Sequence, residues 1–173
     1  MTSDTAPSGT TEPVRWLTTD QQEQWRALFG LLSTLPSAID AQLKRDAGVN
    51  AYEYQVLAAL SQSPGHTIGL SVLAEEARGS LSRLSHALTR LEKAGFVERC
   101  PAAEPGGRRM QARLTETGLA KTEAIAPGHV REVRRLVIDV LTDEQLTALG
   151  DAARAIAAVA GEGAEACTEG PSC

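Results

Sequence analysis

The sequence has little of what metalloproteins and disulfide-stabilised secreted proteins require. Its three cysteines, Cys100, Cys167 and Cys173, are an odd number without a CxxC spacing, so they indicate neither a disulfide framework nor a zinc site. The three histidines lack the HxxxH spacing that would place two imidazoles on one helix face. We therefore expect no metal and no other cofactor.

Long apolar runs are also missing. The chain contains no stretch of about 18 apolar residues and no basic segment followed by an apolar leader. We therefore expect a soluble, cytoplasmic protein that does not enter a membrane.

Motifs of common catalytic sites are absent as well. There is no GxSxG and no GxxxxGKS/T, and the adjacent carboxylates Glu75 and Glu76 point apart on a helix. The sequence therefore predicts that the protein is not an enzyme.

Aromatic residues make up only 3% of the chain, yet most of them precede residue 55. Aromatic walls with a few polar groups are typical of small-molecule pockets. Two interpretations stay open: an aromatic effector pocket, or ordinary packing in the core or a dimer interface, which is the more common role. The residues proposed for the pocket are Trp25, Phe29, Tyr52 and Tyr54.

The charge is unevenly distributed. The chain carries a net charge of -5, but the segment 78–113 holds eight Arg and Lys residues against three Glu residues. A basic patch on an acidic body attracts a polyanion to one face and repels it from the others. Double-stranded DNA is the partner that this asymmetry favours.

The basic segment has the pattern of a helix-turn-helix. A short helix is predicted over 71–77, with Val72, Leu73 and Ala77 on one side, and Arg78-Gly79 forms the turn. A second helix over 81–94 begins at the cap Ser80 and ends at Gly95. Its buried stripe is predicted to consist of Leu81, Leu84, Leu88 and Leu91.

The outer face of the second helix carries short hydrogen-bonding groups and cations. Such side chains suit a major groove, where arginine reads guanine and hydroxyls reach bases or phosphates. The helix alone would equally fit a packed surface helix. The predicted DNA contacts on it are Ser80, Ser82, Arg83, Ser85, His86, Thr89 and Arg90.

Two strands and a basic loop follow. Segments 96–99 and 110–114 are strand-like, and the Pro- and Gly-rich loop between them carries Arg108 and Arg109. Such a hairpin can place a guanidinium in a narrow minor groove. The order of helix, turn, capped helix and basic hairpin favours a winged helix-turn-helix over 49–114, preceded by a strand at 68–70, in a mainly α fold with a small β wing.

The flanking segments are predicted to be helical. We expect a flexible tail over 1–18, a helix over 19–48 with Thr19 and Gln22 as its capping box and a kink or break at Pro36, and a helix from the Asn50–Glu53 box to residue 61.

After the wing, a long helix from residue 115 or 117 through Val140 should bend at Pro127. A last helix, capped by Thr142 and Gln145, should end before a flexible acidic tail over 161–173. The apolar surface of 19–48 and 115–160 predicts that these segments form a dimer.

The chain resembles the MarR family of dimeric winged-helix regulators, in particular a subgroup common in actinobacteria. The resemblance rests on the order of LAEEA, SRLSHALTRLEKAGFVER, RLTETG and APGHVREVRRLVIDVLTDEQLTAL. It implies a homodimer that binds a palindromic operator and acts as a repressor, most often of its own gene, released by a small molecule.

Two points qualify what the resemblance implies. Gly106 stands where the family usually has an acidic residue two positions before the wing arginine, here Arg108. This leaves a second hypothesis, a winged-helix dimer that binds proteins or ligands but no operator. Cys100 is either a redox sensor, as in some members of the family, or a small buried apolar residue, and the latter is the more common role.

Overall fold

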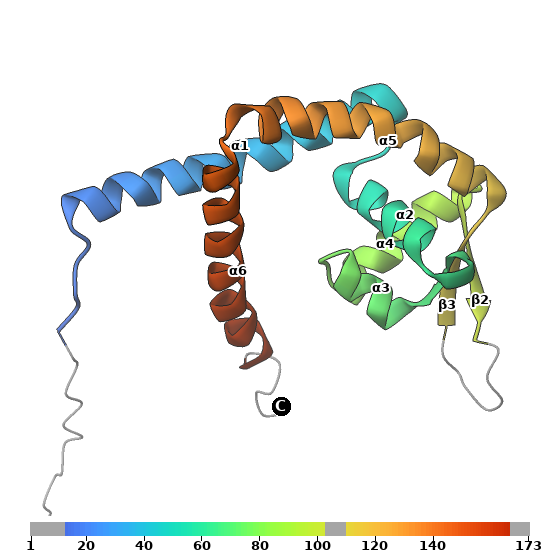
Figure 1. Ribbon diagram of the computed structural model, residues 1–173. Coiled ribbons are helices and arrows are strands. Elements are labelled where there is room, and N and C mark those ends of the chain that lie inside the picture. The colour runs from blue at the N-terminus through green and yellow to red at the C-terminus, as the bar shows by residue number, and fades with distance from the viewer. Residues whose placement is uncertain (1–12, 103–109, 167–173) are drawn as a thin grey trace, which may run out of the picture. The chain divides into compact units, whose positions relative to one another are not determined.

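The computed structural model describes residues 13–102 and 110–166, with side chains placed as far as residue 161 (Figure 1). Predictions for residues 1–12, for 103–109 with Arg108 and Arg109, and for 167–173 lie outside the described residues. The described elements are α1 (Thr19–Ala47), α2 (Ala51–Gln62), η1 (Pro64–His66), β1 (Thr67–Gly69), α3 (Leu70–Glu76), α4 (Leu81–Lys93), β2 (Val97–Pro101), β3 (Met110–Leu114), α5 (Glu116–Leu136), η2 (Ile138–Val140) and α6 (Asp143–Ala166).

Helix α1 is shared between two compact units, residues 1–35 and residues 36–173. It continues through Pro36 as a single helix, so the proline does not end it. Its capping box lies one residue earlier than predicted: Gln21 N donates to Thr18 Oγ1 at 3.2 Å, and Thr18 N donates to the Gln21 side chain at 2.9 Å. The Thr18 side chain therefore satisfies one free amide of the first turn, and the Gln21 side chain satisfies the amide of Thr18.

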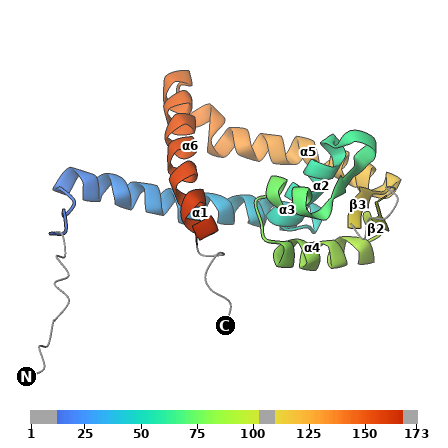
Figure 2. The same ribbon diagram turned by 90° about the horizontal axis from the view of Figure 1, so that it is seen from below.

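The winged module contains α2, α3, α4 and a three-stranded antiparallel sheet in the order β1-β3-β2. Figures 1 and 2 show α2 between α5 and the α3–α4 pair. The predicted capping box of α2 is confirmed, because Asn50 Oδ1 accepts from Glu53 N at 2.9 Å and Glu53 Oε2 accepts from Asn50 N at 2.8 Å. The strand predicted at 68–70 is β1, which pairs with β3.

The core of the module confirms most of the predicted apolar stripe of α4. Leu84, Leu88 and Leu91 are buried against α2, α3 and the sheet. Two residues differ from the prediction: Leu81 is 57% exposed and Val72 is 49% exposed. Leu81 is the first residue of α4 and has helical neighbours on one side only, and Val72 precedes the buried face formed by Leu73, Ala74 and Ala77.

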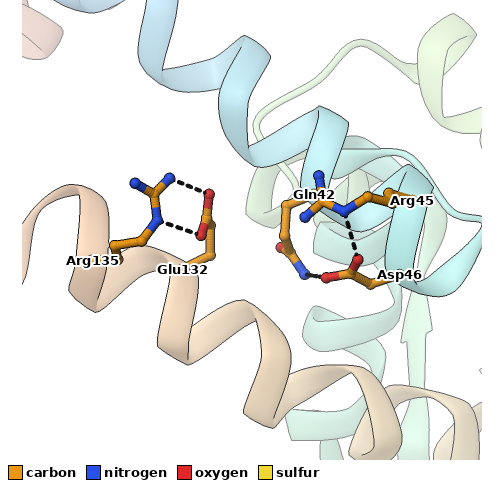
Figure 3. A network of polar contacts seen from close by, with 5 residues as sticks. All are labelled: Gln42, Arg45, Asp46, Glu132 and Arg135. Atoms are coloured by element: carbon orange, nitrogen blue, oxygen red, sulfur yellow. Dashed lines mark hydrogen bonds and ion pairs between the residues drawn. The ribbon is translucent and has the colours of Figure 1, made fainter.

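A second apolar cluster joins residues 36–47 of α1 to α2 and α5. It consists of buried Leu43, Val49, Tyr54 and Ile125. Polar side chains lie nearby: Asp46 accepts from Gln42 and Arg45, and Glu132 binds Arg135 through two hydrogen bonds (Figure 3). Arg45, Asp46 and Arg135 are largely exposed, so solvent screens their ion pairs and these contribute little to stability.

Helices α5 and α6 depart from the prediction at their ends. Thr115, one of the two predicted starts, caps α5, and the α-helix runs through Pro127 but ends at Leu136, before the 3₁₀ turn η2. The capping box of Thr142 and Gln145 is present, with distances of 3.0 and 3.3 Å. Helix α6 continues past Gly161 to Ala166, so the predicted helix end at Gly161 is wrong. No helix within the described ranges is long and apolar enough to span a membrane.

Candidate nucleic-acid interface

Helix α4 begins and ends where the sequence predicts. Ser80 Oγ accepts from Arg83 N at 3.2 Å, and Gly95 has a φ of 75°, which a helix-ending glycine adopts without strain. The predicted DNA contacts on this helix all lie on its exposed side or at its cap. These residues are Ser80, Ser82, Arg83, Ser85, His86, Thr89 and Arg90.

The turn before α4 makes a close approach to α2. Arg78 has a φ of 54°, and Gly79 N donates to Ala74 O at 2.9 Å. A Cβ at position 79 would lie 2.4 Å from Tyr52 Oη and 2.6 Å from the Tyr52 ring. Glycine is therefore needed at position 79 to make room for the tyrosine.

Tyr52 also supports the first arginine of α4. The Arg83 guanidinium lies over the Tyr52 ring, 4.1 Å from its centroid. Tyr52 is only 4% exposed, and its buried Oη has no hydrogen-bond partner among the described residues. Burial raises the pKa of Tyr52, and the nearby Arg83 charge opposes that rise, so the phenol stays neutral.

Arg90, two turns after Arg83, is held differently. Its Nε donates to Glu53 Oε1 at 2.5 Å, and Glu53 is only 7% exposed. The same carboxylate completes the cap of α2, so its charge is satisfied from both sides. Sequence reasoning found the capping role of Glu53 but missed its ion pair with Arg90.

Arg99 is a second residue whose role the sequence analysis missed. From β2, Arg99 Nη2 donates to Ser85 O at 2.9 Å and to Thr89 Oγ1 at 3.1 Å, and its backbone amide donates to Glu92 at 3.1 Å. Thr89 Oγ1 in turn donates to Ser85 O. These bonds tie the wing sheet to α4 and occupy the Thr89 hydroxyl.

The outer face of α4 borders a pocket of about 470 Å³. The pocket lies between residues 36–44 of α1, the start of α2 and α4, and two arginines, a lysine and a histidine line it. Its lining residues are Pro36, Ser37, Asp40, Lys44, Asn50, Ala51, Tyr52, Arg83, His86 and Arg90. Asp40 binds Lys44 at 2.6 Å, and bonds from Lys44 and from Ala51 N lower the pKa of that carboxyl.

The four aromatic residues predicted to line one pocket do not all meet. Trp25 and Phe29 contact each other on α1, with ring centroids 5.9 Å apart, and both are more than half exposed. Tyr52 belongs to the winged-module core, whereas Tyr54 belongs to the second cluster and lies 4.7 Å from the His129 ring. Tyr52 and Tyr54 therefore line different pockets.

Cys100 lies half-buried on β2, opposite Gln111. Its predicted redox role stays a prediction. Within 13–102 and 110–166, no group of three His, Cys, Asp or Glu residues could hold a metal ion.

Comparisons with known proteins agree with this arrangement. The model of the MarR family matches residues 49–104. Sco3205, a MarR family regulator from Streptomyces coelicolor solved in complex with DNA, is 40% identical over 83% of this chain and 90% of its own, with a TM-score of 0.80. AbsC, from the same organism and also a MarR family regulator, is 38% identical over 86% and 99%, again with a TM-score of 0.80.

More distant structures share the fold. NadR, solved with 4-hydroxyphenylacetate, is 24% identical over 84% of this chain and 98% of its own, with a TM-score of 0.57. A search of curated protein sequences found no significant match.

Proposed function

The chain belongs to the MarR family of DNA-binding transcriptional regulators, and from this premise we propose that it is a homodimeric repressor that binds a palindromic operator. In this proposal the operator adjoins its own gene, and a small molecule releases the protein. Each subunit presents α4 to one major groove and the wing arginines Arg108 and Arg109 to the adjacent minor groove.

The observation that carries the proposal is the likeness to Sco3205, which was solved on DNA. The exposed face of α4 supports it, because cations and short polar groups make up that face, with Leu81 at the first position as the exposed apolar residue. Arg83 has no ion-pair partner among the described residues. Its charge therefore remains available to a phosphate or a guanine.

Exposed apolar surface supports the dimer. In one chain, no described side chain of α6 and none of the α1 residues before Leu35 is buried. The large apolar residues exposed there are Trp25, Phe29, Leu31, Leu32, Leu149, Ile156 and Val159. So many exposed large apolar side chains on each of the two helices indicate a protein interface, and a second copy of the chain is the partner that the family assignment favours.

The pocket beside α4 supports the effector. Its volume suits a small ligand, its Tyr52 wall is aromatic, and Arg83, which has no ion-pair partner among the described residues, favours a negative group. The proposed effector is therefore a small aromatic acid. A ligand there would contact Arg83 and His86, side chains that the operator needs, so bound ligand and operator would exclude each other.

The test is a gel shift with DNA flanking the protein's own gene, repeated across salt concentrations. A dimer that neutralises several phosphates should lose affinity steeply with salt, by about 10³-fold or more between 50 and 200 mM for six or more contacts. Ser82→Ala, Arg83→Ala and His86→Ala should change the preferred sequence. Arg154→Ala, which removes an exposed cation of α6 paired with Asp151, is the control and should not.

Two further outcomes separate the rival hypotheses. A dimer without salt-dependent duplex binding would identify a protein-interaction or ligand-binding module and contradict the operator proposal. For the effector, an aromatic carboxylate such as benzoate should displace the operator where neutral benzamide does not. Equal action of the two would contradict an anion-selective pocket.

A further inference from the structure

The first turn of α2 contacts α4 at two adjacent residues, and the two contacts have opposite effects on charge. Glu53 binds Arg90 directly, so one positive charge of the exposed face is compensated. Tyr52 contacts Arg83 only through its ring, 4.1 Å from the guanidinium carbon. A neutral ring attracts the guanidinium through its quadrupole, and it neither neutralises the positive charge nor occupies the N–H groups.

The Tyr52 ring is itself fixed. It is buried in the core cluster of the winged module, which also contains Leu73 of α3 and Ala77 just after that helix. Its hydroxyl edge abuts the backbone of Gly79, where even a methyl group would come within 2.4 Å. The ring cannot move towards the turn, so its face toward Arg83 keeps one orientation.

Holding Arg83 in this way matters for reading a base. A free arginine side chain loses rotamer entropy when it is ordered, and a bidentate contact to guanine requires the guanidinium plane to be aligned. A stacked guanidinium has already lost much of that freedom and keeps its five donors for the base.

We propose that Tyr52 is a positioning residue for operator recognition: its ring, held against Gly79, orients Arg83 for a bidentate base contact, while Arg90 serves as a structural anchor bound to Glu53. This inference rests on the proposed DNA-binding function. It adds that the base preference of α4 is set partly from α2, by a side chain that does not itself contact DNA.

The test compares base preferences of full-length variants, measured by selection from a duplex library randomised within the operator. Tyr52→Phe keeps the ring and should keep the preference. Tyr52→Leu keeps an apolar core residue but removes the ring face, and should reduce discrimination at the base read by Arg83 about tenfold, which corresponds to about 1.4 kcal/mol across a dimer with two such contacts. Positions read by Ser82 or the wing should be unchanged.

A double-mutant cycle separates positioning from stability. In an Arg83→Ala background, Tyr52→Leu should cause no further loss of discrimination, because the residue that it orients is absent. An equal loss in both backgrounds would mean that Tyr52 acts through the fold alone, and would overturn the proposal.

A shape-conserving substitution covers the case in which Tyr52→Leu does not fold. Pentafluorophenylalanine at position 52 keeps the ring but reverses its quadrupole, so it should lose the same discrimination, whereas Tyr52→Phe does not. Unchanged discrimination with this residue would overturn the role of Tyr52 and leave operator binding intact. A wild-type protein that selects no sequence would overturn the proposed function as well.

Discussion

In the winged module, Leu84, Leu88 and Leu91 of α4 are buried, whereas in α6 Ile156 and Val159 are 54% and 72% exposed. Both helices are amphipathic, but only α4 has neighbours within its own chain that cover its apolar side. The module therefore has a complete core in one chain. Helix α6 exposes surface that a second chain can bury, as the proposed dimer requires.

Removing α6 should affect dimerisation and operator binding more than any single substitution. A chain that ends at Val140 keeps every predicted DNA contact but loses the helix with the uncovered apolar side. We expect loss of the native dimer in light scattering and loss of specific operator binding in gel shifts, because two half-sites are no longer bound together.

A chain that ends at Ala166 keeps α6 and serves as the control, with dimerisation and binding like the full chain. A monomeric 1–140 fragment with full operator affinity would contradict the role assigned to α6.

Single substitutions on the apolar sides of α4 and α6 should have different effects. Leu88→Ala should lower the free energy of unfolding by about 2–5 kcal/mol through a cavity in the module core, measured by urea denaturation.

Ile156→Asp in α6 should instead raise the concentration at which half of the chains are dimeric, measured by sedimentation. If Ile156→Asp left the dimer unchanged, α6 would not belong to the interface.

A wing substitution tests function without touching either apolar surface. Arg108→Ala should weaken operator binding by about 1–3 kcal/mol per half-site and leave thermal stability unchanged. Arg113→Ala is the matched control, since it removes the same charge from a residue already paired with Glu98 at 2.7 Å. Equal operator affinity of Arg108→Ala and the wild type would contradict the wing assignment.

The smallest expected effect concerns His129 of α5, which lies against Tyr54 in the region that joins α1, α2 and α5. Burial lowers the pKa of His129, so the folded protein resists protonation more than the unfolded chain. Above the unfolded pKa of about 6.5, His129 is neutral in both states and does not lower the free energy of unfolding. As the pH falls below that value, the unfolded chain takes up a proton more readily than the folded protein, and the free energy of unfolding decreases until the pH reaches the folded pKa.

His129→Phe should therefore flatten the loss of stability as the pH falls below about 6.5, measured by urea denaturation at each pH. His86→Ala, which removes an exposed imidazole, is the control. If the free energy of unfolding of His129→Phe depended on pH as in the wild type, groups other than His129 would cause that dependence.

The parts of the structure that were predictable from the sequence are local. The caps at Asn50, Ser80 and Thr142 and the helix end at Gly95 each depend on residues within one turn. The buried stripe of α4 follows from helical periodicity alone. The one-residue error at Thr18 arose because Thr18 and Thr19 are adjacent and both precede a glutamine at the spacing of a capping box.

The features that were missed depend on contacts between residues far apart in the sequence. Glu53 and Arg90 are 37 positions apart, and the pattern around Glu53 indicates only a cap. Arg99 looks like one cation of a basic segment until β2 is placed beside α4. The position of Tyr52 between Gly79 and Arg83 likewise requires α2 to pack on the helix-turn-helix.

In the proposed dimer, the terminal helices hold the two copies of α4 at a fixed separation. Once the operator is known, its affinity can be measured with about five and about ten base pairs inserted between the half-sites, half a turn and a full turn of the duplex. A rigid dimer predicts that either insertion reduces binding to that of a single half-site. Affinity independent of the spacing would show that the chains bind separately and would contradict the account.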